Sequence, residues 1–433
     1  MPRRSTGKDN SAEPVVVENG PAFGSGQKSF QASSSSNRHL ILTLLFTITV
    51  INFIDRQTLS VLAPVIRSAF HLTNEAYGRI VAAFQFGMMS GELPMGWIMD
   101  RFGSRLGLFC AVLSWSGATG IQAFVGSGAQ LAGARFWMGT CECGNYSGGM
   151  KAVAQLFPVR ERTLAIGIFN SGSVIGSVIA PPLVVYLAQR YGFRTAFLVP
   201  AGLGIIWAGC WLVAYRNPKR LESDMAAPQV PLSSLLRQSS AWAVMLCRFF
   251  VGPVIQFYWY WLPNFLFSTE KMSMTRIGAL SWIPFFVGGI GGVAGGWSAG
   301  WLQKQNFTQY DVRRITMYGS SALCIASLAV PFFHNTVVLL TMMSIAIFGH
   351  NFLSANMYGA ITDLFRENAV GRVTGLTGVA GGLSGLLFPL LTGILVDRVS
   401  YTPVFLMAAV MPLIGTVALL VIGKRHRFNH ALE

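Results

Sequence analysis

Long apolar segments follow one another along most of this chain of 433 residues. An α-helix needs about 20 predominantly apolar residues to cross the hydrocarbon core of a bilayer. From His39 onward, segment after segment reaches that length. We therefore predict an all-α membrane protein with twelve spanning helices, at residues 39–63, 77–98, 105–126, 129–157, 163–188, 193–215, 242–268, 275–302, 312–332, 335–362, 370–396 and 402–424.

Three polar segments divide this pattern. Residues 1–38 contain a run of four serines and no apolar segment, so they cannot bury enough surface to offset the entropy of ordering. Residues 216–240 carry three prolines and several charges, and they separate the sixth predicted span from the seventh. The domain prediction is a disordered tail at 1–38, a six-helix bundle at 39–215, a linker at 216–240, a six-helix bundle at 241–424 and a tail at 425–433.

The two halves of the chain resemble each other. A shift of 208 residues aligns five identical residues, which are Phe157 with Phe365, Gly167 with Gly375, Pro181 with Pro389, Arg190 with Arg398 and Phe197 with Phe405. Two repeated six-helix halves are typical of transporters whose binding site lies near the bilayer midplane, between the halves.

The charge pattern agrees with a membrane location. The chain is 52% hydrophobic with a mean hydropathy of +0.50, and only 11% of its residues are charged. Soluble domains carry about 25% charged residues, so this composition excludes an ordinary soluble enzyme. Lysines and arginines number 21 in the loops and tails on the side of the N-terminus and seven on the other side. Because cytoplasmic loops are enriched in these residues, we predict both termini in the cytoplasm and no nucleic-acid partner.

Three short motifs resemble a known transporter family. The turn after the second predicted span reads Gly96-Trp-Ile-Met-Asp100-Arg101-Phe-Gly103-Ser-Arg105, which is similar to the signature loop of the major facilitator superfamily. The motifs Asn52-Phe-Ile-Asp55-Arg56 and Glu142-Cys-Gly144-Asn145 narrow the resemblance to the anion:cation symporters, and within them to bacterial hexuronate transporters. The resemblance implies twelve transmembrane helices in two pseudo-symmetric six-helix bundles.

It also implies a function. We expect proton-coupled import of a sugar-acid monocarboxylate, with glucuronate or galacturonate favoured, by rocker-switch alternating access in the inner membrane. The alternatives are another organic anion, such as galactonate, glucarate or an aromatic acid, or an uncoupled facilitator or anion exchanger of the same fold. The expected partners are the anion, protons and the lipid bilayer. We expect a monomer with no cofactor and no metal. We do not expect an enzyme, because the one long loop, residues 216–240, lacks the His and Cys that an active site could use.

The functional hypothesis rests on four charged residues in the first and fourth predicted spans. Asp55 and Arg56 lie in the first span, while Arg135 and Glu142 lie two helical turns apart in the fourth. A charge inside a membrane helix costs about 2.5–3.5 kcal/mol on insertion scales and is a functional hypothesis by default. A carboxylate beside an arginine can couple two ligands, because an anion that takes the arginine raises the proton affinity of the acid. The alternative is a pair of ion pairs that only hold helices together.

The resemblance assigns roles to these residues. Asp55 and Glu142 are the expected proton-coupling acids, Arg56 the substrate-carboxylate ligand, and Arg135 a residue of the substrate site that orients Glu142. Polar side chains in apolar helices suit sugar hydroxyls, although helix–helix hydrogen bonding is the alternative for each. The further substrate-binding candidates are Asn145, Asn170, Tyr258, Tyr260, His350 and Asn356, and the predicted gating residues are Asp100, Arg101 and Arg105.

Overall fold

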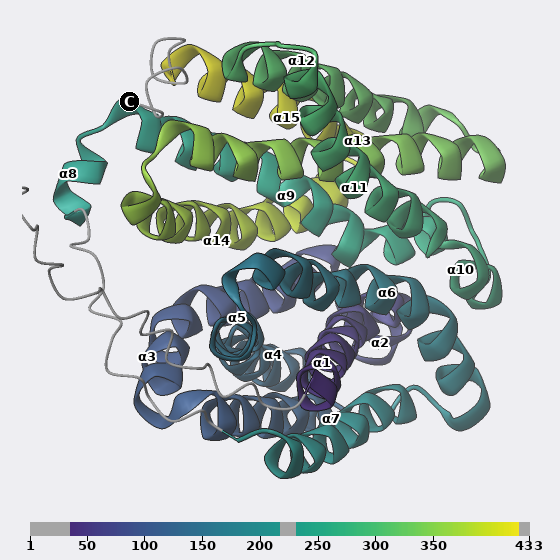
Figure 1. Ribbon diagram of the computed structural model, residues 1–433. Helices are drawn as coiled ribbons and strands as arrows, with labels where there is room; N and C mark the ends of the chain where they lie inside the picture. The colour runs from purple at the N-terminus through teal and green to yellow at the C-terminus, as the bar shows by residue number, and fades with distance from the viewer. Residues whose placement is uncertain (1–34, 217–230, 424–433) are drawn as a thin grey trace, which may run out of the picture.

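The computed structural model describes residues 35–216 and 231–423, and every regular element in these two ranges is a helix (Figure 1). Within the described residues, nine helical stretches are long and apolar enough to cross a membrane. The described residues thus have the helical architecture expected of a multi-pass membrane protein. Nearly all of the predicted N-terminal tail, most of the predicted linker and the whole predicted C-terminal tail lie outside the described residues.

The first half of the chain forms a group of seven helices. They are α1 (Ser35–Val61), α2 (Ala63–Ala69), α3 (Asn74–Ile121), α4 (Gly128–Glu142), α5 (Gly144–Leu156), α6 (Val159–Tyr191) and α7 (Thr195–Ala214). The 48-residue α3 is broken at Gly103, whose backbone has φ 76° and ψ 167°. This conformation is essentially restricted to glycine. The break lies between the predicted spans 77–98 and 105–126, so the sequence located it well.

The second half begins with the short α8 (Leu232–Leu236) and continues with a second group of helices, most of them long. They are α9 (Ser239–Ser268), α10 (Met274–Leu280), α11 (Ile283–Lys304), α12 (Gln309–Cys324), the 3-10 helix η1 (Ile325–Phe332), α13 (Thr336–Leu364), α14 (Glu367–Arg398) and α15 (Thr402–Ile422). Several helices start at a side-chain cap. Ser273, for example, accepts a hydrogen bond from the backbone N–H of Arg276, which satisfies an otherwise unpaired donor.

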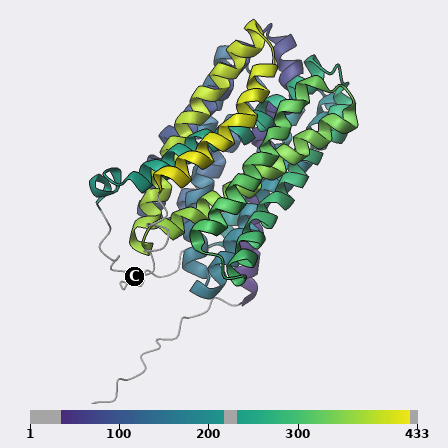
Figure 2. The same cartoon turned by 90° about the horizontal axis from the view of Figure 1, so that it is seen from above.

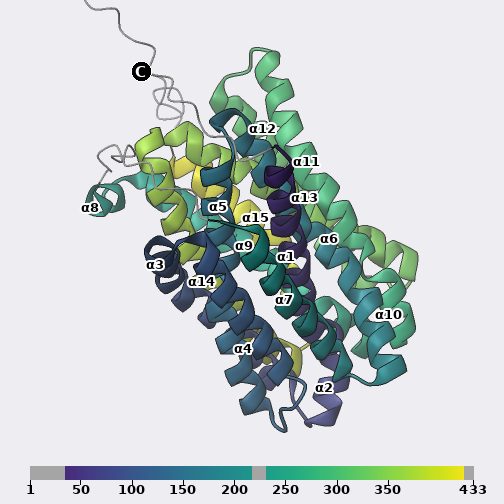
Figure 3. The same cartoon turned by 60° about the horizontal axis from the view of Figure 1, so that its bottom comes forward.

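Figure 1 shows α1–α7 gathered on one side and α9–α15 on the other. We call these the first group and the second group. They meet where α3 packs on α14, α1 on α9, and α6 on α10 and α11. The long helices of both groups lie roughly along a common axis (Figure 2). Figure 3 places α2 and α10 toward one end of the molecule, which we call the α2 end, and α8 toward the other.

The two groups are joined by hydrogen bonds at the α2 end. Asp397 of α14 accepts hydrogen bonds from the backbone N–H groups of Asn74 at 3.1 Å and Glu75 at 2.7 Å, which are the first two residues of α3. The backbones also approach closely, since a Cβ added to Gly78 would lie 2.5 Å from the carbonyl oxygen of Pro389. The α2 end is therefore closed between the two groups.

Large apolar side chains cover much of the outer surface. Leu93, Val213 and Val293 are 86%, 82% and 76% exposed. Exposed apolar area on this scale marks a surface that contacts something other than water. A surrounding bilayer accounts for it, and the polar side chains buried between the helices then become the ones that need a functional explanation.

Candidate functional site

An ion pair between α1 and α4 forms the centre of the candidate site. Arg56 Nε donates a hydrogen bond to Glu142 Oε1 at 2.9 Å. The side chain of Glu142 is fully buried, whereas that of Arg56 is 18% exposed. Taking two charges out of water is costly, so a buried pair is weak evidence for stability. The Arg56 side chain keeps some accessible surface.

The guanidinium group of Arg56 is also held by apolar side chains. It lies 5.0 Å from the ring centroid of Phe53 and 5.6 Å from that of Phe84, within the range of cation–π attraction. Its Nη2 atom is 3.7 Å from the sulfur of Met88. These contacts restrict where the planar group can point.

Asp55 and Arg135 are buried beside this pair, but they do not form the second ion pair that the sequence suggested. Asp55 is 0% and Arg135 is 1% exposed. In the described part of the chain, neither carboxylate oxygen of Asp55 has a hydrogen-bond partner, and the same holds for Nε and Nη2 of Arg135. Unpaired buried charges are expensive. We call Asp55, Arg56, Arg135 and Glu142 the central cluster.

Phe84 of α3 lies between the two arginines. Its ring centroid is 5.6 Å from the guanidinium carbon of Arg56 and 5.9 Å from that of Arg135. One aromatic ring is thus within cation–π distance of two like charges. This position of Phe84 could not be predicted from the sequence, because Phe84 is one of 31 phenylalanines in the chain.

The second group reaches the central cluster through Tyr260 of α9. The Tyr260 side chain is 4% exposed, and its ring lies 6.3 Å from that of Phe84. Because Phe84 lies within cation–π distance of both arginines, this contact places the Tyr260 ring next to the central cluster. The backbone carbonyl of Tyr260 accepts a hydrogen bond from the hydroxyl of Tyr77 at 2.8 Å, which ties α3 to α9 directly beside the cluster.

Asn145 and Asn170 lie on helices of the first group. Asn145 is three residues beyond Glu142, and its Nδ2 atom donates to the hydroxyl of Thr49 at 3.2 Å. Its Oδ1 atom is buried with no hydrogen-bond partner among the described residues, so it remains able to accept one. Asn170 is half-buried on α6. Their substrate-binding roles stay predictions.

Three other predicted substrate residues have different neighbours. The hydroxyl of Tyr258 lies 2.7 Å from that of Ser327 in η1, and His350 Nε2 lies 3.3 Å from the hydroxyl of Ser354. Asn356 Oδ1 accepts from Arg313 at 3.0 Å. The structure does not bring these side chains to the central cluster, so it adds no support for a shared substrate site there.

The predicted gating residues make contacts within the first group. Asp100 pairs with Lys151 of α5 at 2.7 Å, a partner that the sequence did not identify. Arg101 lies 5.8 Å from the ring of Trp97, and Arg105 donates to the carbonyl of Leu212 at 2.8 Å. In this conformation the segment around Gly103 is therefore bonded to α5 through Asp100 and to α7 through Arg105. A gating role for these residues stays a prediction.

A buried ion pair in the second group was missed at the sequence level. Arg313 Nε donates to Asp363 Oδ2 at 2.6 Å, and the two side chains are only 8% and 9% exposed. Arg313 lies at the start of the ninth predicted span, 312–332, where a cation is expected to face the polar loop. The pair, together with the Asn356 contact, joins α12 to α13. It could not be predicted from the sequence, because Arg313 and Asp363 lie near helix ends, where charged residues are common.

Comparisons with known proteins identify the family. A sequence model described as the Major Facilitator Superfamily matches residues 45–349 and 307–432. The chain is 28% identical over 401 residues to the hexuronate transporter of Escherichia coli (strain K12), covering 88% of this chain and 93% of that protein. It is 26% identical over 422 residues to the D-galactonate transporter of Escherichia coli O6:H1, covering 92% and 98%.

Solved structures of low sequence identity share the fold. A bacterial homolog of the human lysosomal transporter Spinster, in an inward-facing and unoccupied conformation, has a TM-score of 0.70 at 18% identity, covering 92% of this chain and 97% of that one. The D-xylose-proton symporter has a TM-score of 0.72 at 15% identity, covering 88% and 97%. The chain therefore belongs to the major facilitator superfamily, whose members are membrane transporters and not enzymes.

Proposed function

We propose that this protein is a symporter that imports a sugar-acid monocarboxylate, a hexuronate such as glucuronate or galacturonate, together with protons. The observation that carries the proposal is the buried Arg56–Glu142 ion pair, in which the arginine remains partly accessible. The names of relatives support an organic anion as cargo, since they are transporters of hexuronate, galacturonate and D-galactonate.

The topology that fits this function has twelve spans. We divide α3 at Gly103 into two spans and join α4 with α5 into one, which together with the nine candidate spans of the described residues makes twelve. With the N-terminus in the cytoplasm, α1 runs outward and the α2 end faces outside the cell. The bacterial relatives favour the inner membrane, and we expect a monomer.

Competition for Arg56 is the proposed coupling step. Arginine presents a planar fork that binds both oxygens of a carboxylate. A substrate carboxylate that takes this fork separates Glu142 from its partner and leaves a buried, uncompensated acid. Binding a proton removes that charge. Substrate binding therefore favours protonation of Glu142, and by linkage protonation favours substrate binding.

Asp55 is the second proposed proton site. It is fully buried, adjacent to Arg56 and without a hydrogen-bond partner in the described ranges. Arg135 stays beside it as a fixed positive charge. Tyr260 supplies a hydroxyl from the second group, so substrate bound at Arg56 would contact both groups. Asn145, with its free acceptor, and Asn170 remain candidates for the sugar hydroxyls.

In the proposed transport cycle, the two groups open alternately at the α2 end and at the opposite end. The α2 end is closed by the contacts of Asp397 and Tyr77, which cross between the groups. Rocking of the two groups would break these contacts and open the central cluster to the outside. The Asp100–Lys151 pair, with Arg101 and Arg105, holds the loop at the opposite end. We assign these residues to the inner gate.

An uncoupled facilitator or exchanger is the alternative, and it would not need Glu142 as a proton site. The test is uptake of D-glucuronate into proteoliposomes by the Glu142→Gln variant, with Glu161→Gln as the control. Glu161 is an exposed acid that pairs with Arg38. We expect Glu142→Gln to keep exchange of internal for external glucuronate and to lose accumulation driven by a pH gradient. Accumulation equal to that of the control variant would refute the coupling role.

The substrate is tested separately by screening sugar acids as stabilisers of the purified protein. We expect glucuronate or galacturonate to raise the melting temperature more than galactonate, glucarate or an aromatic acid does. A ligand that binds only the native state raises its stability in proportion to RT ln(1 + [L]/Kd). If galactonate or glucarate gives the largest shift, the hexuronate assignment is wrong while the transporter class is retained.

A further inference from the structure

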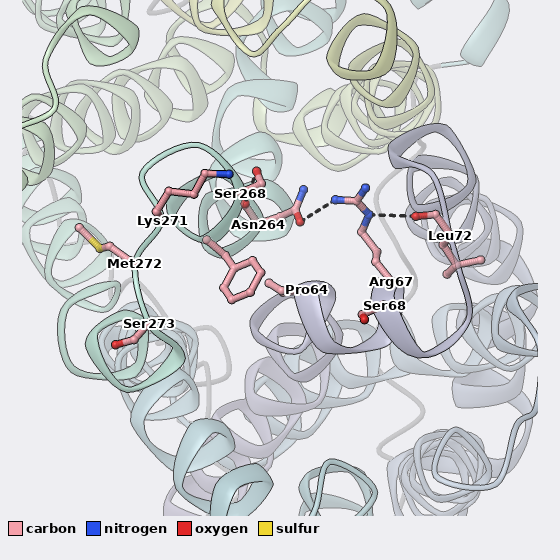
Figure 4. A pocket seen from close by; sticks show the side chains of 10 residues that line it. Pro64, Arg67, Ser68, Leu72, Asn264, Ser268, Lys271, Met272 and Ser273 are labelled. Carbon is pink, nitrogen blue, oxygen red and sulfur yellow. Dashed lines mark hydrogen bonds between the residues drawn. The ribbon is translucent and has the colours of Figure 1, made fainter.

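A pocket of about 620 Å³ lies at the α2 end, away from the central cluster. Its lining comes from both groups, with Pro64, Arg67, Ser68 and Leu72 on one side and the segment from Asn264 to Ser273 on the other (Figure 4). Ligand pockets commonly have volumes of about 300–1,000 Å³. We call this cavity the mouth pocket, and it is large enough for a sugar acid.

Two cations face each other across the mouth pocket. Figure 4 shows Arg67 and Lys271 extending toward Asn264 from opposite sides. Arg67 is fixed in place, because Nη1 donates to Asn264 Oδ1 at 2.9 Å and Nε donates to the carbonyl of Leu72 at 3.3 Å. Its Nη2 atom is not used by either bond. The loop between α9 and α10 presents Lys271 with φ 54°, in the left-handed region.

Two acids lie near this pocket, but the carboxylate of each contacts other residues. Glu270 precedes Lys271, but its carboxylate lies 3.4 Å from His334 and its side chain is only 5% exposed. Asp397 accepts hydrogen bonds from the start of α3. Within the described residues the lining of the pocket contains two cations and no acid. The pocket is therefore positively charged, and such concave sites concentrate anions.

We propose that the mouth pocket is a second binding site for the carboxylate of a sugar acid, occupied from the outside. This inference rests on the proposed function for its ligand class and its orientation. The free edge of Arg67 and the ammonium group of Lys271 bind the carboxylate. The hydroxyl of Ser268 lies in the same lining; its proton is donated to the carbonyl of Asn264, so its oxygen is suited to accept from a sugar hydroxyl.

The position of the pocket determines its effect. Because one wall belongs to the first group and the other to the second, the complete site exists only while the α2 end is closed. A ligand stabilises the conformation to which it binds more tightly. Occupation of the mouth pocket therefore opposes outward opening. We expect high external concentrations of the transported anion to slow its own uptake.

Binding to purified protein tests the site directly. The Arg56→Gln variant removes the central anion ligand, and D-glucuronate is then titrated by isothermal calorimetry. We expect residual binding that weakens about tenfold or more when Lys271→Gln is added, because a charge-assisted hydrogen bond is lost. The matched control is Arg276→Gln, an exposed arginine nearby on α10 that does not line the pocket. No residual binding, or equal binding by the Lys271→Gln and Arg276→Gln combinations, overturns the proposal.

Three further measurements identify the ligand of the mouth pocket and separate this pocket from the central cluster. The uncharged methyl ester of glucuronate should not bind, and equal binding by the ester overturns the carboxylate assignment. If added phosphatidylglycerol blocks glucuronate binding, the pocket binds a lipid headgroup, and the sugar-acid proposal is overturned. In uptake assays, inhibition at high external glucuronate should be relieved in Lys271→Gln and kept in Arg276→Gln. The proposed function fails separately, if Arg56→Gln transports normally.

Discussion

The closed α2 end yields a prediction whose size can be worked from the structure. Asp397 accepts two backbone hydrogen bonds from the first residues of α3, and its Oδ1 atom also accepts from the side chain of Asn74 at 2.7 Å. The acid thus acts as a cap on a helix of the other group. Its negative charge is favourable there, because the N-terminus of a helix carries partial positive charge.

The Asp397→Ala variant removes this cap only from the closed conformation, since the contact exists only while the groups touch. Hydrogen bonds to charged groups contribute about 1.5–3 kcal/mol each, and exposure to solvent reduces such values. With about 1 kcal/mol for each backbone bond, the closed state loses about 2 kcal/mol. This is about a 30-fold change in the ratio of open to closed molecules. Asp397→Asn, which keeps an acceptor but no charge, should change it about fivefold.

The assay measures exposure of a cysteine introduced at Ser60, which is buried at this end and whose hydroxyl donates to the carbonyl of Trp259 at 2.5 Å. A membrane-impermeant thiol reagent is added outside, and the rate without the introduced cysteine is subtracted. We expect faster modification in Asp397→Ala. The control is Asp311→Ala, which removes an acid from a helix start elsewhere. An unchanged or slower rate in Asp397→Ala would refute the capping argument.

Three further predictions concern the interior and the break in α3. Replacing Gly103 by Ala should lower stability by about 1–3 kcal/mol, measured as a lower melting temperature, because φ 76° with ψ 167° suits glycine; Gly96→Ala, with open space around it, should be neutral. Phe84→Leu should weaken glucuronate binding about fivefold by removing cation–π contacts to two arginines, and calorimetry showing unchanged affinity would contradict this. Arg313→Gln should cost about 3–5 kcal/mol by leaving Asp363 buried and unpaired, and a melting temperature equal to wild type would contradict it.

The sequence predicted much of the helical pattern because hydrophobic length is a local property. The break at Gly103 coincides with a gap between two predicted spans, since a glycine in a polar turn is a local signal. The division of the chain into two bundles remains a prediction of the repeat. Local patterns cannot show that Asp397 caps α3, because the partners are more than 300 residues apart.

The candidate site was predictable in its members but not in its pairing. The family resemblance assigned to Arg135 the role of orienting Glu142. The structure pairs Glu142 with Arg56 instead, because residues two turns apart on one helix are separated by about 10 Å, whereas neighbouring helices can approach to contact. The choice between Tyr258 and Tyr260 has a similar cause. Because they are two residues apart on α9, they point to different sides: Tyr258 contacts Ser327, whereas Tyr260 packs on Phe84 beside the central cluster.

The most direct measurement of the central claim is the pH of a weakly buffered suspension of proteoliposomes during uptake. Adding D-glucuronate outside should make the external medium more alkaline, because protons enter with the anion through Asp55 and Glu142. Arg56→Gln should show no such change. Uptake of glucuronate without any rise in external pH, while the vesicles remain tight to protons, would contradict proton-coupled import and favour a facilitator or exchanger.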